Sequence, residues 1–262
     1  MQDPELNEGF IKRAVIAELL RRSVIPRGCC IANEFVIQGT GCRADLAFMG
    51  STPTIGIEIK SNLDSLKRLP KQIEAYGGCF DSIIVVVTAK HLRKTLVTVP
   101  SWAAVWVVQQ DGIIRIQRDG SHRRRPTKRQ LVRLLSLPNL RRLAGKRAAS
   151  VRVELEALAV RNRIETIRGA VANSFRQKFA GPSAEFWSSL GDTGAISDLP
   201  LDALSRFRSR RAAAALAATK ADEFWENWRL KAELAFGNAK PDRKFHKSLH
   251  SSSVSYSPSS SP

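Results

Sequence analysis

The chain has 262 residues, with 42 Lys and Arg against 24 Asp and Glu and a formal net charge of +18. Its length suits one large domain or two small ones. No apolar run reaches the roughly 18–20 residues that a membrane-spanning helix needs, and no basic and apolar leader typical of a secretory signal is present. The four cysteines lack CxxC or CxxH spacing, which argues against a zinc site. We therefore expect a cytoplasmic protein with reduced thiols and no membrane partner.

The positive charge is unevenly distributed along the chain. Residues 1–110 hold 13 Lys and Arg and 10 Asp and Glu, whereas residues 111–262 hold 29 and 14. A basic region favours a polyanionic partner, because each phosphate that it neutralises releases condensed counterions. A solvated basic surface would give the same composition. Between these two, we favour nucleic acid as the partner, although the charge does not say which nucleic acid.

The first 120 residues alternate between helical and strand patterns. A broad apolar face predicts a helix over 7–22. Apolar and β-branched runs between Gly-, Ser- and Pro-containing turns predict strands, at 30–38, 44–49, 54–60, 82–88, 103–109 and 113–117. A helix is expected over 64–76, with Asp64 as its cap and Pro70 as a kink or restart. This order predicts an α/β fold, a mixed sheet with helices packed on it.

The composition changes after residue 120. Residues 121–133 are basic and are expected to lead into short helices. Apolar residues at three- and four-residue spacings predict a long helix over 149–180 that ends at Gly181, and a second helix is expected over about 205–236. The Ser- and Pro-rich residues 248–262 are predicted to be disordered. We therefore divide the chain into a domain over 1–120, a basic helical region over 121–247 and a tail over 248–262.

The residues with the clearest chemistry are Asp45 and the run Glu58-Ile59-Lys60. Residues two apart in a strand point to the same side, so Glu58 and Lys60 share a face. The hairpin of strands 44–49 and 54–60 can bring Asp45 beside Glu58. Two carboxylates that close repel each other unless a proton or cation lies between them, and Mg²⁺ prefers such oxygen ligands. Mg²⁺ beside a lysine could hydrolyse a phosphodiester; alternatively, Glu58 and Lys60 form only a surface ion pair.

Asp45 followed by Glu58-x-Lys60 at a strand end resembles the PD-(D/E)XK nuclease superfamily. The string EIKSNLDSLKRLPKQIEAYGGCFDSIIVVVTAKH, residues 58–91, is similar to a bacterial family of largely uncharacterised members of that superfamily. The resemblance covers roughly residues 5–118, and Ala44 departs from it because the superfamily name expects proline there. It implies a restriction-endonuclease-like mixed sheet flanked by helices, followed by a mainly helical C-terminal region.

The resemblance also implies roles for individual residues. Its catalytic residues would be Asp45, Glu58, Lys60 and Gln72. The first two would bind Mg²⁺, with Mn²⁺ as an alternative ion, and the backbone carbonyl of Ile59 would be a further ligand. Gln72 would orient a water molecule or the lysine.

A further acidic residue usually completes such sites. Glu34 fits the narrower bacterial family, and Glu18 on the first helix fits the more common placement in the superfamily. We prefer Glu34 as this additional metal ligand.

Several basic residues are candidates for phosphate contacts or for a solvated surface, namely Arg43, Lys67, Arg68, Lys71, Arg123, Arg124 and Arg125. The leading hypothesis is a Mg²⁺-dependent nuclease that hydrolyses phosphodiester bonds in DNA; because many members of the superfamily act as dimers, a homodimer is one option. The alternative is a non-catalytic nucleic-acid-binding accessory protein with a vestigial nuclease site. Four aromatic residues are assigned to core packing rather than to a protein interface, namely Phe175, Phe179, Trp225 and Trp228.

Overall fold

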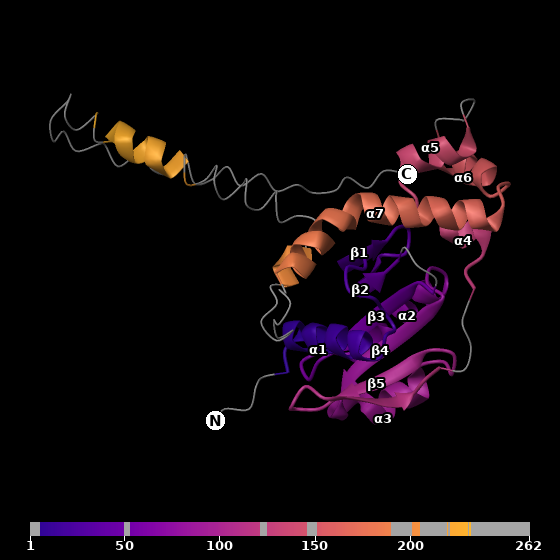
Figure 1. Cartoon of the computed structure of the whole chain (residues 1–262), viewed down its shortest axis with the longest axis vertical. Coiled ribbons are helices and arrows are strands. Elements are labelled where there is room, and N and C mark those ends of the chain that lie inside the picture. Colours follow the sequence, from indigo (N-terminus) through magenta and orange to yellow (C-terminus); the bar gives the residue numbers. More distant parts are fainter. Residues whose placement is uncertain are drawn as a thin grey trace. The chain divides into compact units, whose positions relative to one another are not determined.

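The structure is a computed structural model that describes residues 6–49, 53–120, 125–145, 151–189, 201–204, 219, 221–229 and 231. The chain divides into two compact units, Met1–Arg208 and Ser209–Pro262. The first unit is α/β, as predicted, and contains a six-stranded mixed sheet (Figure 1). The predicted boundaries at residues 120 and 247 and the closer likeness to restriction endonucleases stay predictions.

The strands follow one another in the sheet in the order in which they occur in the sequence. They are β1 (Ile31–Ile37), β2 (Cys42–Phe48), β3 (Ile55–Lys60), β4 (Ser82–Thr88), β5 (Ala104–Val108) and β6 (Ile114–Arg118). The pairs β1–β2, β2–β3 and β5–β6 are antiparallel, whereas β3–β4 and β4–β5 are parallel. Parallel neighbours need crossover connections, and helices provide both of them.

The first crossover contains the 3₁₀ helix η1 (Leu66–Arg68) and helix α2 (Leu69–Gly77), and the second is helix α3 (Ala89–Thr98). Pro70 lies in the first turn of α2, where its missing N–H costs nothing. Helix α3 was not predicted. It follows β4 directly with no Gly or Pro between them, so the sequence gives no sign of the change from strand to helix.

Two apolar layers form on opposite faces of the sheet. Helix α1 (Glu8–Arg21) covers one face and packs with the odd-numbered isoleucines of β3. The other face carries Ile73 and Tyr76 of α2 together with Phe80. On this face a Cβ atom at Gly56 would lie 2.4 Å from the Phe80 ring. Glycine at this position is therefore required for the close approach of the ring to β3.

The later helices of the first unit are α4 (Lys128–Val132), α5 (Leu137–Ala144), α6 (Arg152–Ala159) and α7 (Ile164–Ser188), followed by the 3₁₀ helix η3 (Leu201–Leu204). Helix α7 crosses the β1 end of the sheet (Figure 1). Its Arg168 guanidinium pairs with Asp81 at 2.8 Å. Towards its C-terminus, the hydroxyl oxygen of Ser183 accepts a hydrogen bond from the N–H of Ile31 at 2.9 Å. These polar contacts fix α7 to the sheet at two separated points.

The helices after residue 120 differ from prediction in two respects. The segment expected to be one helix over 149–180 is divided between α6 and α7, with a break at 160–163. Helix α7 also continues through Gly181 and Pro182 to Ser188, because contacts near its C-terminus with the start of β1 hold that end in place. Tertiary contacts have overridden the local stop signals.

Within the second unit, residues 219, 221–229 and 231 are helical. Phe224, Trp225 and Trp228 pack edge-to-face with one another and remain about 60% exposed within the structure described. The assignment of the two tryptophans to a core was therefore wrong, whereas Phe175 and Phe179 of α7 are buried as predicted. The tail predicted over 248–262 lies outside the described residues. None of the described helices is long and apolar enough to cross a membrane.

Candidate functional site

A polar pocket of about 490 Å³ opens where β2 and β3 meet α2. Leu46 of β2 lies opposite Ile57 of β3, and this register places Asp45 beside Glu58 as predicted. The pocket brings together eight of the predicted site residues, namely Arg43, Asp45, Glu58, Ile59, Lys60, Arg68, Lys71 and Gln72. We call this cavity the polar pocket.

Glu58 and Lys60 form a buried ion pair within β3. The Lys60 ammonium lies 2.6 Å from one Glu58 carboxylate oxygen, and the two side chains are 6% and 1% exposed. The interpretation of this pair as a surface ion pair is therefore wrong. Both side chains of this buried pair have lost their hydration, so each charge is stabilised mainly by the other.

Tyr76 forms a hydrogen bond with the second carboxylate oxygen of Glu58. Its hydroxyl donates to that oxygen and also lies 2.6 Å from the carbonyl oxygen of Arg43. Burial and the negative charge of Glu58 raise the pKa of Tyr76, so the hydroxyl keeps its proton. Both oxygens of Glu58 therefore already have a partner inside the protein.

Asp45 is the second carboxyl group of the polar pocket. One of its oxygens accepts a hydrogen bond from the N–H of Ile59 at 2.6 Å. Burial and, next, the charge of Glu58 raise the pKa of Asp45 to about 8, although the Ile59 N–H and nearby Lys12 act in the opposite direction. The raised pKa favours the neutral form of Asp45, and the Glu58–Lys60 pair carries no net charge.

The residues at this position are poor ligands for the expected Mg²⁺ or Mn²⁺ ion. Glu58 is engaged by Lys60 and Tyr76, and Asp45 holds a peptide N–H while its pKa favours a proton. Within the described ranges, no group of three or more His, Cys, Asp or Glu residues could hold a metal ion. Mg²⁺ prefers ionised oxygen ligands, so we derive no chemistry through a metal here.

Neither candidate for the additional acidic ligand reaches the polar pocket. Glu34 is exposed, has a φ of 58°, and pairs with Arg43 at 3.1 Å. Glu18 pairs with Arg21 at 2.7 Å and with Arg22 at 2.6 Å. The hydrogen bond from Arg21 lowers the pKa of Glu18, so this carboxylate is already satisfied. Neither residue lines the pocket, and each carboxylate is paired with arginine instead.

The basic residues predicted to contact phosphate divide into two groups. Arg68 and Lys71 line the polar pocket, and Lys67 is exposed beside them. None of these three makes an ion pair within the part of the chain that the structure describes. Arg125 is exposed before α4, whereas Arg123 and Arg124 lie outside the described residues. Arg43 also lines the pocket but is paired with Glu34, so Lys67, Arg68 and Lys71 are the predicted residues that lie at this site without an ion pair to any described residue.

The structure adds two residues that sequence analysis did not assign to the site. Tyr76 is the hydrogen-bond partner of Glu58, and its position four residues after Gln72 on the same helical face could have indicated this. Lys12 of α1 is 4% exposed and contacts Glu8 at 2.6 Å and Asn33 at 2.7 Å. Nothing in its local sequence distinguishes it from a surface lysine.

Comparison with known proteins identifies the family. A family model described as Bacteriophage P4 protein cII matches residues 1–205 of the chain. This chain belongs to the bacteriophage P4 protein cII family. It is also 28% identical over 213 residues to Protein cII of Enterobacteria phage P4, and the match covers 78% of the chain and 80% of that protein. No solved structure matches the chain.

Membership of the P4 cII family corrects the expectation of a nuclease. Both matches are to phage P4 protein cII, and neither is to a PD-(D/E)XK family. The resemblance to that superfamily, and the metal-dependent phosphodiesterase activity that it implied, were therefore wrong. The residues Asp45, Glu58 and Lys60 do converge in space, but each already has a partner inside the protein: Glu58 binds Lys60 and Tyr76, and Asp45 binds the N–H of Ile59. A short motif that forms a cluster does not by itself establish an activity.

Proposed function

We propose that this member of the P4 cII family is a non-catalytic DNA-binding protein that contacts phosphates through the outer wall of the polar pocket. The observation that carries the proposal is the group Lys67, Arg68 and Lys71. These three cations lie together on η1 and the start of α2, and they form no ion pair among the described residues. We call them the basic triad.

The spacing of the basic triad suits a phosphate backbone. Lys67 and Lys71 are four residues apart and Arg68 and Lys71 three, so the side chains lie on neighbouring parts of one surface. Arginine and lysine supply most protein contacts to phosphate oxygens. Arg68 and Lys71 are at the pocket and Lys67 beside it, so a backbone that follows the triad passes the pocket mouth.

The interior of the polar pocket supports a binding role without catalysis. The Lys60 ammonium is committed to Glu58 and is nearly inaccessible, so it is not available to an incoming phosphate. Protonated Asp45 does not repel an approaching anion as an ionised carboxylate would. Among the described residues, Arg68 and Lys71 line the pocket without an ion pair, whereas the acidic residues Glu8 and Asp64 that also line it are engaged by Lys12 and by Ser61. This arrangement leaves the cations available to a polyanion.

The test is a salt-dependent DNA-binding titration of the full chain. The triple variant Lys67→Gln, Arg68→Gln and Lys71→Gln should bind a fluorescent duplex more weakly. The slope of log K against log salt should fall by about 2–3, since each phosphate contact contributes about 0.9. A matched control is Arg141→Gln, Arg142→Gln and Arg161→Gln, which removes the same charge from exposed positions on and after other helices. The control should retain most of the slope.

Two results would contradict the proposal. If the triad variant and the control lost the same small amount of affinity, binding would reflect overall charge rather than this surface. If wild-type protein cut the duplex in the presence of Mg²⁺, the proposal that the protein is non-catalytic would be wrong. The same samples, run with single-stranded DNA and RNA and in analytical ultracentrifugation, test the choice of nucleic acid and the predicted homodimer.

A further inference from the structure

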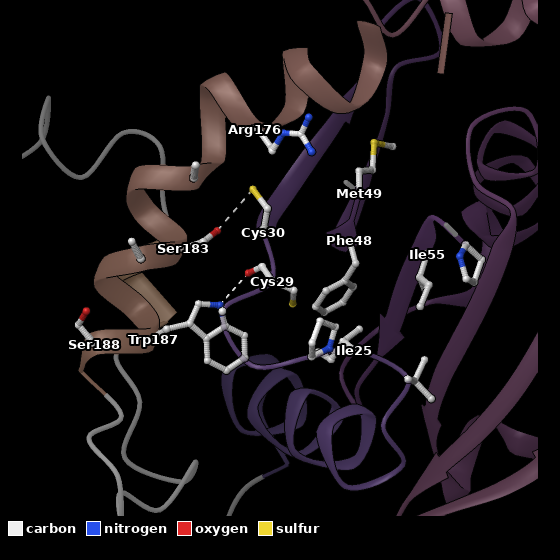
Figure 2. A pocket seen from close by; sticks show the side chains of 16 residues that line it. Ile25, Cys29, Cys30, Phe48, Met49, Ile55, Arg176, Ser183, Trp187 and Ser188 are labelled. Carbon is white, nitrogen blue, oxygen red and sulfur yellow. Dashed lines mark hydrogen bonds between the residues drawn. The ribbon is translucent and has the colours of Figure 1, made fainter. Parts of the chain in front are cut away.

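A second pocket, of about 530 Å³, lies between the C-terminal half of α7 and the loop that joins α1 to β1 (Figure 2). Its floor is formed by Ile25, Phe48, Met49 and Ile55, which are between 2% and 5% exposed. Helix α7 contributes Trp187 to the wall. The volume lies within the range of small-molecule sites, which are typically apolar with a few placed polar groups. We call this cavity the apolar pocket.

Most polar atoms around the apolar pocket are already engaged. The indole N–H of Trp187 donates to the carbonyl oxygen of Cys29 at 2.7 Å. Ser183 contacts the backbone of Ile31, and burial raises the pKa of Cys29 to about 12, so its thiol stays neutral. These groups hold the wall together and offer a ligand little beyond an apolar surface.

Arg176 is the exception. Among the described residues that line the apolar pocket it is the only charged one, and none of them is acidic. Figure 2 shows its side chain projecting from α7 towards the side of the pocket where Met49 lies. The guanidinium contacts the side-chain oxygen of Asn173, which is neutral, and makes no ion pair within the described part of the chain. A guanidinium has five donors, so most of them remain available.

We infer that the apolar pocket binds a small amphipathic carboxylate, with its apolar body on the Phe48 and Ile55 floor and its carboxylate on Arg176. A single cation above an apolar cavity matches a monoanion with a hydrocarbon or aromatic body. The planar guanidinium can hold the two carboxylate oxygens through parallel N–H···O bonds. The site is separate from the basic triad, and the inference does not depend on DNA binding.

The experiment is calorimetric titration of the full chain with decanoate below its micelle concentration. We expect saturable binding of one decanoate per chain. Octanoate should bind about tenfold more weakly and dodecanoate about tenfold more tightly, because two methylene groups are buried or lost in each case. Decyltrimethylammonium, which has the same tail and a positive head group, should bind at least tenfold more weakly than decanoate.

Three variants separate the contributions of charge and volume. Arg176→Gln should weaken decanoate binding about tenfold and remove the preference over the cation. Arg161→Gln, an exposed arginine outside the pocket, is the matched control and should change nothing. Ala184→Phe should abolish binding, because Ala184 lines the pocket from an exposed position on α7 where a larger side chain need not disturb the core.

Circular dichroism would confirm that each variant keeps its helix content. The inference fails if wild-type protein binds no decanoate, if affinity does not rise with chain length, or if the ammonium compound binds equally well. It also fails if Arg176→Gln binds decanoate as tightly as the Arg161→Gln control. Binding that follows chain length, prefers the carboxylate and needs Arg176 would establish the site.

Discussion

The polar pocket and the apolar pocket have similar volumes and opposite chemistry. The polar pocket buries an acid–base pair within the sheet and holds a second, partly exposed carboxyl group beside it. The apolar pocket has a hydrophobic floor, and the one charge among its described lining residues, Arg176, is on an exposed position of α7. The first lies where β2 and β3 meet α2, whereas the second lies between α7, the loop before β1 and the hairpin that joins β2 to β3.

This difference shows why a cluster of charges is not always a place where ligands bind. A charge that has been removed from water must be matched inside the protein, and Lys60 is matched by Glu58. A charge that stays exposed pays no such cost and remains available, as Arg176 and the basic triad do. We therefore expect substitutions inside the polar pocket to affect stability most, and substitutions at exposed charges to affect binding.

The largest effect is expected for Lys60→Met. Removing the ammonium leaves Glu58 buried without its ion-pair partner, which should lower the free energy of unfolding by about 3–5 kcal/mol. The double variant Glu58→Gln and Lys60→Met should recover most of this loss, because no uncompensated charge remains. Urea denaturation of the full chain measures both. If the single variant were as stable as wild type, Lys60 would not be needed to neutralise the buried charge of Glu58, and the interpretation of this pair would be wrong.

A smaller effect is expected at the wall of the apolar pocket, for Ser183→Ala. The substitution leaves the buried N–H of Ile31 without its hydrogen-bond acceptor and should lower the free energy of unfolding by about 2 kcal/mol. Ser189→Ala is the matched control, because its hydroxyl is exposed and bonds only to a carbonyl of its own helix; a change within about 0.5 kcal/mol is expected there. Equal losses in the two variants would show that Ser183 does not anchor α7 to β1.

The polar pocket was largely predictable from sequence because its residues lie on neighbouring strands. Period-two alternation placed Glu58 and Lys60 on one face, and a short hairpin placed Asp45 opposite Glu58. What could not be read from the sequence was how these groups are satisfied. The hydrogen bond from Tyr76 to Glu58 and the burial of Lys60 depend on how α2 packs on β3, and the sequence motif carries no information about that packing.

The apolar pocket was not predicted at all. Its residues come from segments about 150 positions apart, such as Cys29 and Trp187, and local pattern carries no information about such pairs. The sequence pattern also predicts that α7 ends at Gly181. A helix ending there would not contain Ser183 and Trp187, which line the pocket. Local signals can describe an element, but the contact that extends α7 past Pro182 is tertiary.

The smallest expected effect concerns the second carboxyl group of the polar pocket, in Asp45→Asn. The pKa of Asp45 is about 8 in the folded protein and about 3.9 in an unfolded chain. Between these values the folded state binds the proton and the unfolded state does not, so the contribution of Asp45 to stability falls as pH rises from about 4 to about 8. The asparagine side chain is neutral throughout this pH range, and its carbonyl oxygen can still accept the hydrogen bond from the N–H of Ile59.

Asp45→Asn should therefore match wild type near pH 4 and exceed its free energy of unfolding by about 1–2 kcal/mol at pH 9. The gain stays small because the Asp45 side chain is partly exposed, and water screens the ionised carboxylate. Asp111→Asn, at an exposed turn, is the control and should show no gain that grows with pH. A stability difference independent of pH, or a loss at pH 9, would mean that the pKa of Asp45 is not raised in the folded protein. The polar pocket would then hold a negative charge that its own residues do not neutralise, and the contrast with the apolar pocket would rest on volume and hydrophobicity alone.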